Sequence, residues 1–255
     1  MNQRLTLPPQ PVRIQLCGRF SVVVDGTPCE DALPGRQGQR LFAYLVLYRQ
    51  VHLERSQLVD AVWGSTPPKA ADAALSALLS KLRGVLGDDF TTGRGVPAIT
   101  LPAGTYVDVE HALDTVHRGE TQLARGQFAD AYTSAGARYI AERTFLAGHE
   151  GDWIDDWRRR MDDVLIRALA IDAEAALRLG GLELATADRA SKQLIEKCPF
   201  RESAFALRMD VLEALGNTAE ALLVYDELLR RLSDELGAGP GPELQVRHER
   251  LLRMT

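Results

Sequence analysis

The chain has 255 residues, of which 45% are hydrophobic and 25% charged, and its formal net charge is −5. These values are ordinary for a soluble globular protein of one large or two average domains, and the negative charge excludes a protein that binds polyanions over its whole surface. The charge is uneven: residues 1–108 hold 11 Lys and Arg against 9 Asp and Glu, and residues 109–255 hold 19 against 26. A slightly basic half beside an acidic half fits a nucleic-acid reader joined to another module.

Residues 1–11 are rich in proline and lack the apolar stretch of a signal peptide, so we expect a flexible N-terminal arm on a cytoplasmic protein. The longest apolar run, residues 41–48, is far too short to cross a membrane, and we expect no membrane partner. The cysteines lie far apart and are interpreted as reduced, buried thiols: Cys17, Cys29 and Cys198.

The first ordered elements are predicted to be strands. Alternating apolar residues over 12–16 and 20–24 precede Asp25-Gly26, a strong hairpin-turn signal, and a return strand from Thr27. Helical spacing then predicts three helices, around 41–48, 58–63 and 69–86, with a short β-like stretch at 51–53. The third helix is expected to bury one leucine stripe: Leu75, Leu79, Leu82 and Leu86.

Two further strands, 96–101 and 105–109, are predicted to form a hairpin through the turn at 102–104. The order of sheet, three helices and hairpin is that of a winged helix-turn-helix, an α+β fold with a small antiparallel sheet and a wing, which binds DNA with a helix in the major groove. We therefore predict a DNA-binding domain at 12–110.

The rest of the chain, 111–255, is predicted to be an all-α, tetratricopeptide-like domain, which makes the protein mostly α. Gly126, Gly180 and Gly216 each interrupt helical patterns in similar phrases, and the last two are 36 residues apart by number. The segment 201–236 is predicted to be a helical hairpin that ends at Gly237. Its expected core residues are Phe205, Met209, Leu212, Leu222, Tyr225, Leu229, Leu232 and Leu236.

Enzyme signatures are missing from the sequence. There is no phosphate-binding GxxxxGK[ST] loop, no HExxH zinc motif and no GxSxG nucleophile elbow, and the histidines are scattered. Three consecutive arginines, residues 158–160, are flanked by aspartates and are interpreted as part of a charged helix surface. We expect a protein that is not an enzyme and needs no cofactor or metal.

The face of the third helix opposite its leucines is the candidate DNA-reading face. Its residues are small or basic, as close approach to base edges and phosphates requires: Lys69, Ala73, Ser76, Ala77, Ser80 and Lys81. Arg83 lies at its flank, as a phosphate clamp or an ion-pair partner. Arg36 and Arg40 near the first helix and Arg94 before the predicted hairpin are candidates for phosphate contact, with solvated surface charge as the alternative.

These residues resemble a known family. The letters DAVWG at 60–64, PP at 67–68 and KLRGVLG at 81–87 resemble the DNA-binding domain of the Streptomyces antibiotic regulatory proteins. The second half is similar to their bacterial transcriptional activation domain, through PFRE at 199–202, Gly216, Ala221-Leu222, Tyr225, ELG at 235–237 and PGPEL at 240–244. The resemblance covers about residues 12–252.

The resemblance implies a transcriptional activator that binds double-stranded DNA at tandem direct repeats upstream of promoters, as two protomers side by side. It also implies contact with RNA polymerase and its sigma factor, often at secondary-metabolite genes such as those of antibiotic biosynthesis. One departure is Ser80-Lys81, where relatives often have Ser-Arg, because Lys cannot make the bidentate contact of Arg to guanine. The alternative function is a protein-interaction or ligand-sensing module whose winged helix does not bind DNA.

Overall fold

The structure, a computed structural model, describes residues 12–87, 91–92 and 98–254. The chain divides into two compact units, each built from two stretches. The winged unit comprises Met1–His111 and Arg143–Met161, and the helical unit comprises Ala112–Glu142 and Asp162–Thr255. The segment 143–161 thus joins the first unit although it lies beyond the boundary expected at residue 110. No helix in the described residues is long and apolar enough to cross a membrane.

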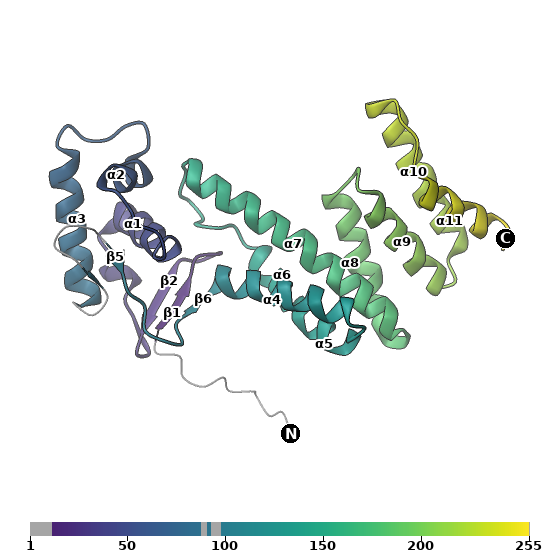
Figure 1. Ribbon diagram of the computed structural model, residues 1–255, viewed down its shortest axis with the longest axis horizontal. Coiled ribbons are helices and arrows are strands. Elements are labelled where there is room, and N and C mark those ends of the chain that lie inside the picture. The colour runs from purple at the N-terminus through teal and green to yellow at the C-terminus, as the bar shows by residue number, and fades with distance from the viewer. Residues whose placement is uncertain (1–11, 88–90, 93–97, 255) are drawn as a thin grey trace, which may run out of the picture. The chain divides into compact units, whose positions relative to one another are not determined.

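The sheet of the winged unit has four strands in the order β3-β2-β1-β6 (Figure 1). The strands are β1 (Val12–Gln15), β2 (Ser21–Val24), β3 (Thr27–Pro28) and β6 (Tyr106–Val107). β1 and β2 pair antiparallel with Ile14 opposite Val22, and both of these side chains are fully buried. The turn between β2 and β3 has positive φ at Asp25 and Gly26, as the Asp-Gly signal predicted.

The predicted hairpin of 96–101 with 105–109 is wrong. β5 (Ala98–Ile99) pairs antiparallel with β4 (Thr91–Thr92), and β6 instead pairs in parallel with β1, so the sheet is mixed where an antiparallel one was expected. The cause is Asp108, whose buried carboxylate accepts hydrogen bonds from the backbone N–H of Leu16 and Cys17 just after β1. This contact directs β6 to the edge of β1.

Three helices that pack against one another follow β3: α1 (Gly35–Leu47), α2 (Arg55–Trp63) and α3 (Ala71–Leu86), with a 3₁₀ turn η1 (Glu30–Ala32) before them. The β-like stretch predicted at 51–53 is not a strand, because Glu54 and Gln57 form a capping box that starts α2 directly after it. α3 begins two residues later than predicted, which leaves Lys69 in the preceding loop. It buries Leu75, Leu78, Leu82 and Leu86, so Leu78 replaces Leu79 in the expected stripe.

The helical unit consists of antiparallel helices that follow one another. Its helices are α4 (Asp108–Ala124), α5 (Phe128–Thr133), α6 (Arg138–Ala141), α7 (Asp152–Leu179), α8 (Leu184–Lys197), α9 (Glu202–Ala214), α10 (Thr218–Leu236) and α11 (Pro242–Leu252), of which α4 and α7 start in the winged unit. Two 3₁₀ turns, η3 (Ser134–Ala137) and η4 (Gly181–Glu183), lie between them. Figure 1 shows α8, α9 and α10 as successive neighbours. No strand follows β6 in the part of the chain that the structure describes.

The turns between these helices are where the glycines predicted them. Gly126, Gly180 and Gly216 all have positive φ, and Gly237 ends α10 in the left-handed conformation. Phe205, Met209 and Leu212 of α9 are buried, as expected. On α10, however, Leu229 and Leu236 are exposed, and the core is filled by Ala221, Val224, Tyr225, Leu228 and Leu232. The prediction for α10 was therefore correct in extent and for the buried Tyr225 and Leu232, and wrong for Leu229 and Leu236.

Candidate nucleic-acid interface

The face of α3 opposite its buried leucines is open to solvent. Ala73, Ala77 and Ser80 follow each other at helical spacing, and Gly84 continues the same line, so side chains there are short along the whole helix. The remaining predicted residues of this surface are exposed too: Lys69, Ser76, Lys81 and Arg83. A helix with a narrow, small-residue outer face and basic residues at its flanks has the dimensions to approach base edges closely.

The first turn of α3 is fixed to α2 by Arg55. Its guanidinium donates hydrogen bonds to the Asp72 carboxylate at 3.2 Å, to the Asp72 carbonyl at 3.1 Å and to the Ser76 hydroxyl at 2.8 Å. The Ser76 hydroxyl in turn donates to the Asp72 carbonyl. Both hydrogen-bonding roles of Ser76 are thus used within the protein, while Ser80 and Lys81 point outward from the next turns. Arg55 was not among the predicted residues, and no local sequence pattern marks it.

Arg36 and Arg40 lie on α1, and both bind backbone carbonyls of the winged unit. The exposed Arg36 donates to the Gly148 carbonyl, and the half-buried Arg40 donates to the Ala61 carbonyl at 2.9 Å. Burial, and then the neighbouring Arg36, lowers the pKa of Arg40. Arg40 therefore joins α1 to α2, whereas Arg36 lies at the surface. Arg94 lies outside the described residues, and the phosphate contacts predicted for these arginines stay predictions.

The segment 143–161 closes the core beneath these helices. The Leu146 N–H binds the Leu16 carbonyl and the Gly18 N–H binds the Thr144 carbonyl, which adds this segment to the end of β1. The buried ring of Phe145 stacks on Trp157 at 5.7 Å between ring centroids. Trp153 donates its indole N–H to the Ala61 carbonyl of α2 at 3.0 Å. The end of β1 and helix α2 are thus supported by residues from far along the chain.

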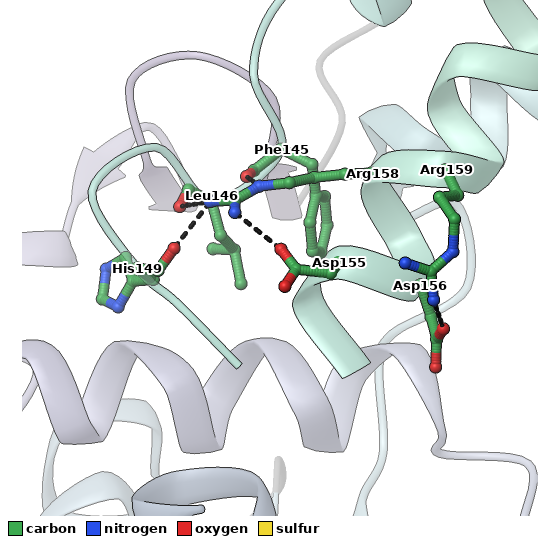
Figure 2. Close-up of polar contacts among 7 residues, drawn as sticks. All are labelled: Phe145, Leu146, His149, Asp155, Asp156, Arg158 and Arg159. Carbon is green, nitrogen blue, oxygen red and sulfur yellow. Dashed lines mark hydrogen bonds and ion pairs between the residues drawn. The ribbon is translucent and has the colours of Figure 1, made fainter. Parts of the chain in front are cut away.

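Arg158 holds the turn that leads into α7, as Figure 2 shows. Its guanidinium donates to the carbonyls of Phe145 at 3.3 Å, Leu146 at 3.5 Å and His149 at 2.6 Å, and to the Asp155 carboxylate at 2.8 Å. The neighbouring Arg159 donates to the Asp156 carboxylate, and both of these side chains are exposed. The interpretation of the arginine triplet as surface charge is therefore wrong for Arg158.

A sequence signal for this role of Arg158 did exist. Ile154 and Met161, which are buried, lie four residues before and three residues after Arg158 and therefore share its side of the helix. Helical spacing alone could have separated Arg158 from Arg159, which lies on a different side.

His149 is buried in the same turn. Its ring Nε2 lies 3.2 Å from the Gln39 amide oxygen, and its Nδ1 has no hydrogen-bond partner among the described residues. Burial lowers the pKa of His149, and the positive charges of Arg36, Arg40 and Arg158 lower it further. The imidazole is therefore neutral at pH 7, which suits a position among three guanidinium groups.

Comparison with known proteins places the chain in a family. The protein family described as "Bacterial transcriptional activator domain" matches residues 107–252, which is more than half of the chain. The transcriptional regulator RedD of Streptomyces coelicolor is 30% identical over 94% of this chain and 70% of its own length. The chain belongs to the Streptomyces antibiotic regulatory protein family. Its named relatives are regulators of transcription.

Further relatives of this Streptomyces antibiotic regulatory protein are larger. The regulatory protein AfsR of Streptomyces griseus is 28% identical over 85% of this chain but only 22% of its own length. The structure of Mycobacterium tuberculosis EmbR in complex with a low-affinity phosphopeptide superposes with a TM-score of 0.81 at 21% identity, over 97% of this chain and 66% of that one. That likeness establishes the fold, in which a winged helix-turn-helix precedes a helical, tetratricopeptide-like part.

Proposed function

We propose that the chain is a sequence-specific DNA-binding transcriptional activator that acts in the cytoplasm. The observation that supports this most directly is the outer face of α3, which is exposed along its length, lined by Ala73, Ala77 and Ser80, and backed by four buried leucines. A helix of this kind enters the major groove without a steric barrier. Membership in a family of transcriptional regulators supports the same reading.

Each residue of the face has a proposed contact. Ala73 and Ala77 pack on thymine methyl groups, Ser80 binds a base edge or a phosphate, and Lys81 reads a base or neutralises a phosphate. Ser76, whose hydroxyl is held by Arg55, contributes close packing more than readout. Phosphate contacts on either side come from Lys69, Arg36, Arg40, Arg83 and Arg94, which fix the register of the protein on the duplex.

We further propose that two protomers bind tandem direct repeats upstream of promoters, side by side, and recruit RNA polymerase through contacts that include its sigma factor. Secondary-metabolite genes are the proposed targets. No enzymatic step and no cofactor is part of this function. Because Lys81 makes no bidentate fork to guanine, specificity is shared with the second protomer and with DNA shape.

The test is selection of bound fragments from a source-genome library at about 150 mM salt, where non-specific phosphate binding is weak. Enriched fragments that share a direct repeat near promoters are the expected result. Folded protein that enriches no sequence would overturn the proposal in favour of the alternative, an interaction module whose winged helix does not bind DNA.

Lys81→Ala then tests the reading face on the selected site. A loss of about 1–3 kcal/mol confined to the specific site indicates base readout, and a similar loss on all sequences indicates a phosphate contact. Lys192→Ala, which removes an exposed lysine from α8 in the helical unit, is the matched control. A Lys81→Ala variant that binds every DNA as the wild type does would remove Lys81 from the interface.

A further inference from the structure

The helical unit contains a hollow that DNA binding leaves unexplained. Its volume is about 330 Å³, and it lies among α4, α7, α8 and α9. Its apolar lining comes from all four helices: Leu123, Ala170, Ile171, Leu194, Ala204 and Leu207. Ile171, Leu194 and Ala204 are buried in the protein core, so they form a rigid floor. The volume and this lining are typical of sites for small organic molecules.

The charged residues around the hollow are mostly paired with one another. Arg167 donates two hydrogen bonds of 2.7 Å to the Glu120 carboxylate, and this contact lowers the pKa of Glu120. Glu174, a second carboxylate of the lining, is bound at 2.7 Å by Arg178. Guanidinium groups of the protein itself therefore pair with both carboxylates of the lining.

Arg201 is the exception. It lines the hollow beside Ser203, its side chain is exposed, and no ion pair or side-chain hydrogen bond involves it among the described residues. It precedes Glu202, the first residue of α9, whose carboxylate binds the Gly241 N–H at 2.8 Å and is directed away to that partner. The Arg201 guanidinium is therefore an uncompensated positive charge at the edge of the apolar lining of the hollow.

We propose that this hollow binds a small amphipathic monocarboxylic acid, with its carboxylate on Arg201 and Ser203 and its apolar part on Ile171, Leu194 and Leu207. A guanidinium group matches a carboxylate in geometry as well as in charge. A single negative charge is favoured over a dianion such as a phosphate monoester, because Arg201 supplies one uncompensated positive charge and the other arginine of the lining, Arg167, is already paired with Glu120. The site is independent of the proposed DNA contacts, and its ligand stabilises the helical unit by binding its folded form.

The probe is decanoate, titrated below its micellar concentration into the full chain by calorimetry, with thermal unfolding followed by far-ultraviolet circular dichroism. Decanoate is expected to bind and to raise the unfolding temperature. Decanol and decylamine have the same chain without the negative charge and are expected to bind at least about tenfold more weakly, as the loss of a charge-assisted contact implies. Equal binding of decanoate and decanol would overturn the proposed role of the carboxylate.

Two variants locate the site. Arg201→Gln is expected to weaken decanoate binding about tenfold or more and to leave decanol unchanged. Arg230→Gln removes an exposed arginine of α10 elsewhere in the same unit and is expected to have no effect. Ala170→Leu fills the hollow and is expected to abolish binding of both probes, whereas Ala129→Leu on the exposed side of α5 is expected to preserve it.

The outcomes are decisive even if Ala170→Leu fails to fold, because Arg201 is at the surface and its replacement leaves the core intact. Binding of decanoate that neither Arg201→Gln nor Ala170→Leu changes would place the ligand elsewhere and overturn the proposal. Absence of decanoate binding by the wild-type chain would overturn it as well. Neither result bears on DNA binding, which is measured separately on α3 variants.

Discussion

Arg158 offers the sharpest test of how the winged unit is held together, because its neighbour Arg159 is a matched control on the same helix. Arg158→Ala removes the bonds to three backbone carbonyls and to Asp155 shown in Figure 2. The 2.6 Å bond to the His149 carbonyl involves a charged donor and contributes about 1.5–3 kcal/mol. The half-exposed pair with Asp155 adds about 0.3–0.5 kcal/mol, and the two longer bonds add roughly 0.5 kcal/mol.

The expected loss of unfolding free energy for Arg158→Ala is therefore about 2–4 kcal/mol. Arg159→Ala breaks an ion pair whose side chains are 71% and 65% exposed, and it should cost no more than about 0.5 kcal/mol. Urea unfolding followed by tryptophan fluorescence measures both. All three tryptophans of the chain, Trp63, Trp153 and Trp157, lie in the winged unit, so the signal reports on that unit.

With a urea slope of about 1–3 kcal/mol/M, the midpoint of Arg158→Ala should fall by about 1 M or more, and that of Arg159→Ala should hardly move. Equal shifts in the two variants would refute the conclusion that Arg158 holds the turn. A small shift of the urea midpoint in both variants would show that aromatic packing alone stabilises the turn before α7 and that the Arg158 guanidinium is not required.

Three further predictions concern other parts of the molecule. Because burial and nearby positive charge lower the pKa of His149 from its ordinary value of 6.5, the winged unit should be fully stable above that pH and lose stability as the pH falls below it. Urea midpoints at about pH 7.5 and pH 5 should differ, and the difference should shrink in His149→Gln. Ala77→Glu places a negative charge on the outer face of α3 and should reduce DNA affinity at least about tenfold, whereas Ala129→Glu on α5 should leave it unchanged. Gel-shift titrations measure both affinities, and an unchanged affinity of Ala77→Glu would show that this face of α3 does not contact DNA. Arg138→Ala leaves the buried Asp172 carboxylate without its ion-pair partner and should lower the free energy of unfolding by about 3–5 kcal/mol, measured by circular dichroism. The double variant Arg138→Leu, Asp172→Leu should recover much of this stability. Equal stability of the single and the double variant would contradict the prediction.

Local signals predicted most elements of the fold, and contacts between distant residues account for the errors. Asp25-Gly26 and the helix-ending glycines act within a few residues, so their turns were predicted correctly. The partner of β6 is chosen by Asp108, whose contacts with Leu16 and Cys17 span about ninety residues, and hydrophobic alternation in a two-residue strand cannot reveal it.

The buried faces of helices were harder to predict than their extents. On α3 the sequence offers adjacent leucines, Leu78 and Leu79, and only packing against α1 and α2 selects the first. On α10, Leu229 and Leu236 fit a helical stripe, but the neighbouring α9 packs against Val224 and Leu228. The outer face of α3 was predicted with more success in one respect, since its residues are exposed as required. Their contact with DNA stays a prediction.

The winged unit is complete only with the segment Arg143–Met161. In the sequence this segment follows 31 residues of the helical unit, Ala112–Glu142. A ribosome synthesising this chain therefore releases α1, α2 and α3 well before the Phe145, Trp157 and Arg158 side chains that complete the winged unit. Because domains fold as units during synthesis, the winged unit has to wait for residue 161 while the start of the helical unit is already exposed. Folding of the winged unit and folding of the helical unit thus overlap in time, and a nascent chain halted near residue 111 contains α3 but lacks the segment that completes the winged unit.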